Sequence, residues 1–83
     1  MVREDVGMAI LHVLSQCRGF KLPRESLFER VRLRMGESVS YDELILTLQF
    51  TRDADWVAFD LNSFRRERFW LTQRGQMQLS DGV

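Results

Sequence analysis

The fold of this chain is decided by one stretch, WVAFDLNSFRRERFWL at residues 56–71. Residues 56–61 and 67–71 are rich in aromatic and β-branched side chains with near-alternating polarity, which is typical of half-buried strands. Asn62 and Ser63 between them favour a turn. We therefore predict an antiparallel hairpin. Its loop length stays open, because Phe64, Arg65 and Arg66 are also compatible with the tip.

Helical periodicity and helix-end signals predict three helices before the hairpin and one after it, at residues 3–17, 23–35, 41–52 and 73–79. Pro23 suits a first helical position, and Gly36 a helix end. Ser40 and Glu43 have the spacing of a capping box, in which each side chain accepts from a backbone N–H of the other residue. Thr72 is placed to cap the final helix.

The apolar residues of the first three helices fall on stripes that indicate one shared core. We expect this core to contain Val6, Ala9, Ile10, Val13, Leu14, Cys17, Leu27, Phe28, Val31, Met35, Tyr41, Leu44, Ile45 and Leu48. Together with the hairpin, the helices predict an α+β fold that is mostly helical. With 83 residues, the chain is expected to form one domain, residues 1–83.

The composition limits the function classes that we consider. Twelve basic and twelve acidic residues give a formal net charge of zero. The single cysteine and the lack of a secretory signature predict a cytoplasmic protein, and no apolar run is long enough to span a membrane. His12 has no partner at catalytic or metal-ligand spacing, and Cys17 lies on a core stripe. We therefore expect no enzyme activity, metal, cofactor or small-molecule substrate.

The predicted order of elements and the C-terminal run FWLTQRGQMQL, residues 69–79, resemble the winged helix-turn-helix superfamily of bacterial or phage regulators. Many of these end in aromatic-x-Leu-Thr-x-x-Gly-x-x-x-Leu. Here Phe69 or Trp70 supplies the aromatic, Leu71 and Thr72 form the strand-to-helix junction, and Gly75 is the glycine. The resemblance implies a winged helix with three helices, a two-stranded antiparallel hairpin and a short C-terminal helix.

If the resemblance extends to function, the chain is a small DNA-binding protein, a transcriptional regulator that acts on double-stranded DNA as a homodimer. The helix at residues 41–52 would enter the major groove and the hairpin tip would contact the DNA backbone or minor groove. Arginine suits this role because its guanidinium is a planar fork of donors. The residues implied at the DNA are Arg65, Arg66, Arg68, Arg52, Gln49 and Thr47.

Three features oppose DNA binding and favour an alternative. The chain is not basic, and Asp42 and Glu43 stand in the first turn of the helix that would enter the groove. Apolar residues also fall outside the predicted core stripes, as they do in protein interfaces. The alternative is a protein-interaction module, adaptor or small inhibitor on the same scaffold that does not bind DNA. Its expected interface residues are Leu46, Phe50, Met8, Leu11 and Leu33.

Overall fold

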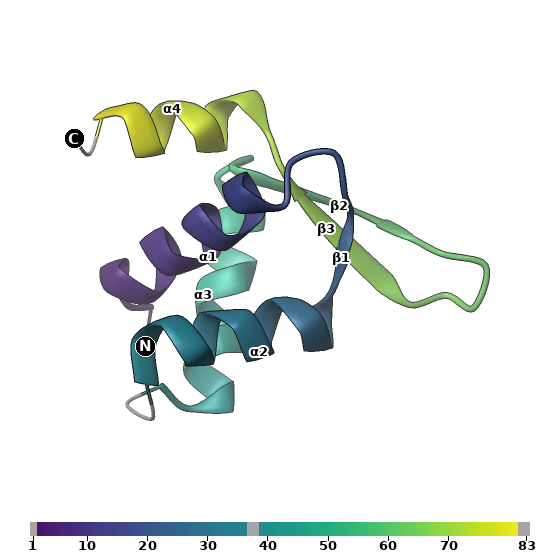
Figure 1. Ribbon diagram of the computed structural model, residues 1–83, viewed down its shortest axis with the longest axis horizontal. Coiled ribbons are helices and arrows are strands. Elements are labelled where there is room, and N and C mark those ends of the chain that lie inside the picture. Colours follow the sequence, from purple (N-terminus) through teal and green to yellow (C-terminus); the bar gives the residue numbers. More distant parts are fainter. Residues whose placement is uncertain (1, 37–38, 82–83) are drawn as a thin grey trace.

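The computed structural model describes residues 2–36 and 39–81, except for the side chain of Asp81, and within them the chain has an α+β fold. Four helices and three short strands follow one another in the described residues (Figure 1). In chain order they are α1 (Glu4–Gln16), β1 (Leu22–Pro23), α2 (Arg24–Met35), α3 (Tyr41–Asp53), β2 (Val57–Leu61), β3 (Glu67–Leu71) and α4 (Gln73–Asp81).

The helix ends follow the local signals in the sequence. Pro23 is the N-cap of α2 rather than its first residue, and Gly36 ends the helix with φ 78°, a conformation that glycine adopts without strain. The Ser40–Glu43 capping box of α3 is confirmed. The Glu43 N–H donates to Ser40 Oγ at 3.1 Å and the Ser40 N–H donates to Glu43 Oε1 at 3.3 Å.

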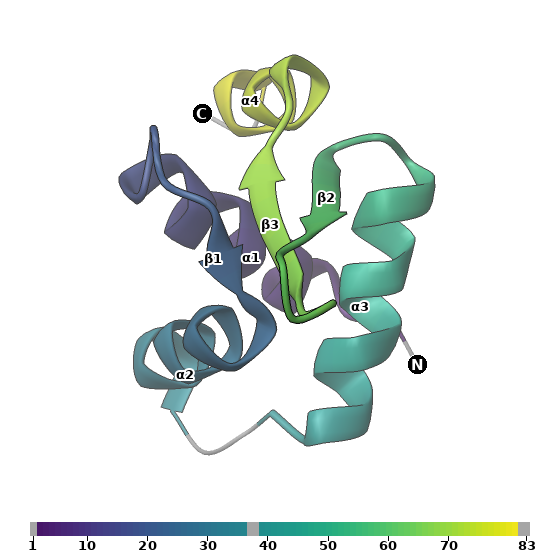
Figure 2. The ribbon, with the colours of Figure 1, turned by 90° about the vertical axis from the view of Figure 1, so that its right-hand side faces the viewer.

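The predicted hairpin is confirmed, and its register is now fixed. Strand β2 pairs antiparallel with β3, with Phe59 opposite Phe69 and Asp60 opposite Arg68. The loop between the strands is residues 62–66, and we call it the hairpin tip. Strand β1 was not predicted. It adds to the other edge of β3, so the sheet order is β1–β3–β2 (Figure 2).

The core surrounds α1, which contacts α2, α3, α4 and β3. Because α1 is covered on several sides, Leu11 is fully buried although it lies off the predicted stripe. The prediction that Leu11 belongs to an exposed interface is therefore wrong. Tyr41 was expected in the core but is half-exposed, with its ring edge-on to Phe28. Cys17 is only partly buried and packs against the core.

The junction between β3 and α4 explains why the sequence has Thr72 and Gly75 at this spacing. Thr72 Oγ1 accepts from the Gly75 N–H at 3.0 Å and donates to the Asp55 carbonyl at 2.6 Å. The Thr72 N–H donates to the Trp56 carbonyl at 3.1 Å. A Cβ on Gly75 would lie 2.2 Å from that carbonyl oxygen, so only glycine fits here without movement.

Candidate interaction surface

The arginines predicted at DNA lie in three different environments. Arg65 and Arg66 are exposed in the hairpin tip. Arg68 lies within β3, where its guanidinium forms two hydrogen bonds of 2.9 Å to the Asp60 carboxylate on the neighbouring strand. Lys21 also donates to Asp60 at 2.7 Å, and Lys21 followed by Arg68 lowers the pKa of that carboxyl. Arg68 is therefore engaged within the fold by a carboxylate that it shares with Lys21.

Arg52 is held by the hairpin. Its guanidinium carbon lies 3.7 Å from the centre of the Phe59 ring, and its Nη1 donates to Glu67 Oε2 at 3.2 Å. Glu67 also pairs with Arg24 of α2, so its carboxylate joins both helices to the first residue of β3, directly after the tip. Arg52 stabilises the attachment of the hairpin, and only part of its surface faces solvent.

The two remaining DNA predictions lie on α3. Thr47 is fully buried, and its Oγ1 accepts from the Arg3 N–H at 3.4 Å. The prediction that Thr47 faces a DNA groove is wrong, because the segment before α1 covers this side of α3. Gln49 is exposed, and its amide donates to Asp53 Oδ1 at 3.0 Å.

The outward face of α3 is apolar and acidic. Leu46 and Phe50 stand one helical turn apart and keep 47% and 46% of their surface exposed. Asp42 and Asp53 are exposed on the same helix. Arg52, the basic residue of α3, is engaged by Glu67. A phosphate backbone approaching this face would therefore meet carboxylates and hydrocarbon.

A hollow of about 380 Å³ adjoins this face, between the start of α1, α3 and α4. Its apolar wall consists of Val2, Met8, Phe50 and Trp56, and we call it the Phe50 groove. The Phe50 and Trp56 rings meet edge-on with their centres 5.6 Å apart. The sequence predicted Met8 and Phe50 as interface residues, but gave no signal for Val2.

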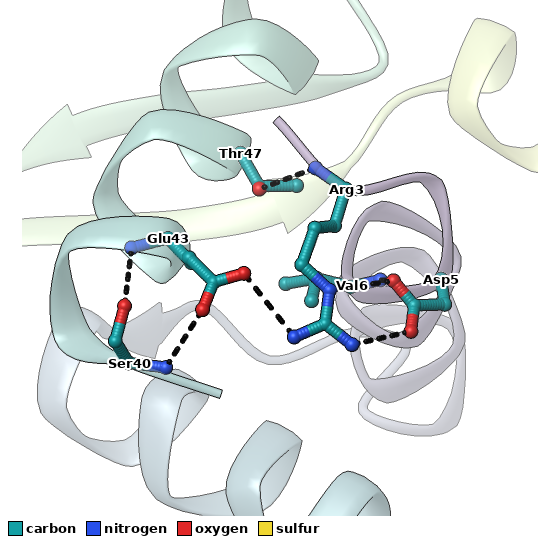
Figure 3. A network of polar contacts seen from close by, with 6 residues as sticks. All are labelled: Arg3, Asp5, Val6, Ser40, Glu43 and Thr47. Atoms are coloured by element: carbon teal, nitrogen blue, oxygen red, sulfur yellow. Dashed lines mark hydrogen bonds and ion pairs between the residues drawn. The ribbon is translucent and has the colours of Figure 1, made fainter. Parts of the chain in front are cut away.

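A network of polar contacts around Arg3 adjoins the Phe50 groove, which Arg3 itself lines (Figure 3). The Arg3 guanidinium pairs with Asp5 at 2.7 Å and with Glu43 at 3.2 Å, so it joins the start of α1 to the capping box of α3. These contacts raise the pKa of Arg3 and lower the pKa of Asp5. The pKa of Glu43 is lowered first by its hydrogen bond from the Ser40 backbone and then by Arg3.

The charged side chains at and beside this edge of the groove are mostly acidic. Arg3 and Glu4 line the groove, whereas Asp5 and Glu43 lie next to it as the ion-pair partners of Arg3. Arg3 contributes one positive charge, against three carboxylates from Glu4, Asp5 and Glu43. Glu4 is exposed and also lines the groove. These four side chains, which together we call the rim, carry a net charge of −2 at neutral pH.

Comparisons with known proteins assign the chain to no protein family. No family model, curated protein or solved structure matches it. Across the described part of the chain, no helix is both long and apolar enough to cross a bilayer.

The predicted interface residues separate into two regions and one buried position. Met8 and Phe50 line the groove, and Leu46 stands beside it on α3. Leu11 lies in the core, as described above. Leu33 is 79% exposed on α2 and lines a different hollow, of about 700 Å³, with Phe28, Val39 and Tyr41 among its walls.

Proposed function

We propose that the chain is a winged-helix domain that binds another protein through the Phe50 groove and the outward face of α3. The winged-helix assignment is supported by the order of elements, three helices followed by a hairpin and a closing helix. Because one fold hosts many functions, the binding role depends on the surface. The observation that carries it is the pair of half-exposed residues, Leu46 and Phe50, on an acidic helix face that continues into an apolar groove.

The size of the apolar surface indicates how a partner must bind. Full burial of a leucine or phenylalanine side chain is worth about 1.5–3 kcal/mol, so covering the exposed halves of Leu46 and Phe50 yields about 1.5–3 kcal/mol together. Association costs at least about 4 kcal/mol in lost freedom of motion. The partner must therefore also fill the groove, and its chemistry should combine an apolar anchor with basic residues that face Glu4, Asp42 and Asp53.

Trp56 offers a direct test, because it lines the groove and its fluorescence responds to a change in solvent contact. In a Trp70→Phe background Trp56 is the single tryptophan. The probes are short amphipathic peptides of equal apolar content, one basic and one acidic. We expect the basic peptide to shift Trp56 emission saturably, and Phe50→Asp to abolish the shift.

The matched control is Leu33→Asp, which adds the same charge at an exposed leucine on α2. This variant should bind the basic peptide as the parent does. Equal binding of the acidic peptide, or equal binding by the Phe50→Asp variant, would refute the proposed role of the groove.

A second candidate function, binding of double-stranded DNA through the hairpin tip as in a transcriptional regulator, is favoured by Arg65 and Arg66. Both are exposed, and neither side chain forms an ion pair within residues 2–36 and 39–81. Two phosphate contacts per chain predict a slope of log affinity against log salt of about −1.8, twice that in a dimer.

This candidate is tested by DNA titrations at several salt concentrations. Replacing both tip arginines by alanine should remove the salt dependence. Replacing Arg32 and Arg34, which are exposed on α2, should leave it unchanged. If both double variants weaken DNA binding equally, the contact is non-specific attraction and the tip has no special role.

A further inference from the structure

The hairpin tip presents an apolar anchor between polar and basic neighbours. Phe64 is 84% exposed, the highest fraction among the large hydrophobic residues of the described chain. It is followed directly by Arg65 and Arg66, which are also exposed. The tip therefore has the combination of apolar and basic groups that the Phe50 groove requires of a partner.

The tip is held in one conformation by its own hydrogen bonds. Asn62 Oδ1 accepts from the Phe64 N–H at 2.8 Å and from the Arg66 N–H at 3.0 Å. The Asn62 carbonyl accepts from the Arg65 N–H at 2.9 Å, and Arg65 adopts φ 61°. Because the loop is already ordered, binding through it loses little further conformational freedom.

The tip cannot reach the groove of its own chain. Figure 1 places the tip at one end of the long axis, whereas the first turn of α1 and the end of α4 lie toward the other. The groove is built from those two helices and α3. A contact between tip and groove must therefore join two chains.

We propose that the hairpin tip of one chain inserts Phe64 into the Phe50 groove of a second copy. Arg65 and Arg66, with a charge of +2, then face the rim formed by Arg3, Glu4, Asp5 and Glu43, with a net charge of −2. The inference rests on the proposed function, because it names the occupant of the protein-binding groove.

The contact joins two different surfaces, so it is heterologous. A heterologous contact leaves a free tip at one end of each pair and a free groove at the other, and assembly continues into an open chain or a closed ring. The interaction should weaken at high salt, because its charged part is at the surface and is screened.

Sedimentation of the full chain over a range of concentrations tests this arrangement. The parent should exceed the mass of a dimer as its concentration rises toward roughly millimolar, the range in which weak contacts are populated. Phe64→Asp removes the anchor from the tip. Glu4→Lys reverses a charge on the rim without altering the core. Each should weaken association about tenfold or more, and Leu33→Asp should not.

Mixing separates this arrangement from a symmetric dimer. A Phe64→Asp chain keeps an intact groove, and a Phe50→Asp chain keeps an intact tip. Each alone should be monomeric, and their mixture should form dimers and nothing larger. Circular dichroism confirms that each variant is folded. If a folded variant associates like the parent, or if the mixture stays monomeric, the tip-to-groove contact is refuted.

The failure of this inference is distinguishable from failure of the proposed function. A parent chain that stays monomeric to roughly millimolar concentration while the basic peptide still shifts Trp56 emission refutes self-association alone. A monomeric parent with no peptide response refutes both. Association that continues in the Phe64→Asp variant but is lost in Phe50→Asp identifies the groove as a symmetric interface and refutes the role of the tip.

Discussion

Replacement of Gly75 by alanine tests the junction between β3 and α4 most sharply. The new Cβ would lie 2.2 Å from the Trp56 carbonyl oxygen and 2.6 Å from Leu71 Cδ1, whereas Cβ contacts essentially never fall below 3.0 Å. The side chain of Leu71 can rotate, but the carbonyl is backbone. The first turn of α4 must therefore move away from Trp56 by about 0.8 Å, the difference between 3.0 and 2.2 Å.

This movement has a cost that can be estimated. It strains or breaks the bonds from Thr72 to the carbonyls of Trp56 and Asp55, and each such bond is worth about 0.5–1.5 kcal/mol. Overpacking typically adds about 1–3 kcal/mol. Alanine offsets about 1 kcal/mol of this loss, because its helix propensity is higher than that of glycine. The net loss is about 1–5 kcal/mol, and each kcal/mol lowers the melting temperature of a domain of this size by about 4–8 °C.

The matched control is Gly7→Ala in α1. There the new Cβ meets only Thr47 Cγ2, at 3.5 Å, which is an ordinary contact. This variant should be as stable as the parent, or more stable by up to about 1 kcal/mol. Thermal and urea unfolding followed by circular dichroism measure both variants. A Gly75→Ala chain as stable as the parent, or a Gly7→Ala chain that loses as much, would contradict the close approach described here.

Three further perturbations have defined outcomes. Ser40→Ala removes the cap of α3 and should lower the free energy of unfolding by about 1 kcal/mol in urea titrations; no change would mean that the cap is not formed in solution. Phe69→Ala opens the fully buried centre of the sheet and should cost about 3–5 kcal/mol, enough to prevent cooperative melting. Acid should also destabilise the chain, because the pKa values of Glu43 and Asp60 lie below their ordinary 4.5 and 3.8 in the fold. That stability is fully present above about pH 5 and is lost as pH falls through the folded-state pKa values. The melting temperature should hold from pH 7 to 5 and drop toward pH 3, and a Glu43→Gln, Asp60→Asn variant should drop less.

The elements with local signals could be predicted from the sequence. The capping residues Ser40 and Thr72, the glycine at position 36 and the alternation in residues 57–61 each act on neighbouring residues, so their effect does not depend on distant parts of the chain. Strand β1 could not be predicted in the same way. It has two residues, and its pairing with β3 depends on a partner more than forty positions later.

The surface residues were harder to predict for the same reason. Helical periodicity cannot reveal that the segment before α1 covers Thr47. The pairing of Arg68 with Asp60 follows directly from the hairpin register, but the register depends on a loop length that the sequence left open. Arg52 is engaged by Glu67 of the hairpin, fifteen positions away. These ion pairs, and not the number of arginines, determine which positive charges remain available.

Trp56 serves two parts of the molecule at once. Its carbonyl accepts a hydrogen bond from the Thr72 N–H, just before α4, and its ring forms a wall of the Phe50 groove. A ligand that binds the groove and stabilises this position of Trp56 therefore also stabilises the packing of α4 against Trp56. By linkage, that packing raises the affinity of the groove for the ligand by the same factor. The amide protons of the last helix would then exchange more slowly with solvent when the groove is filled, although the occupant lies beside a different helix.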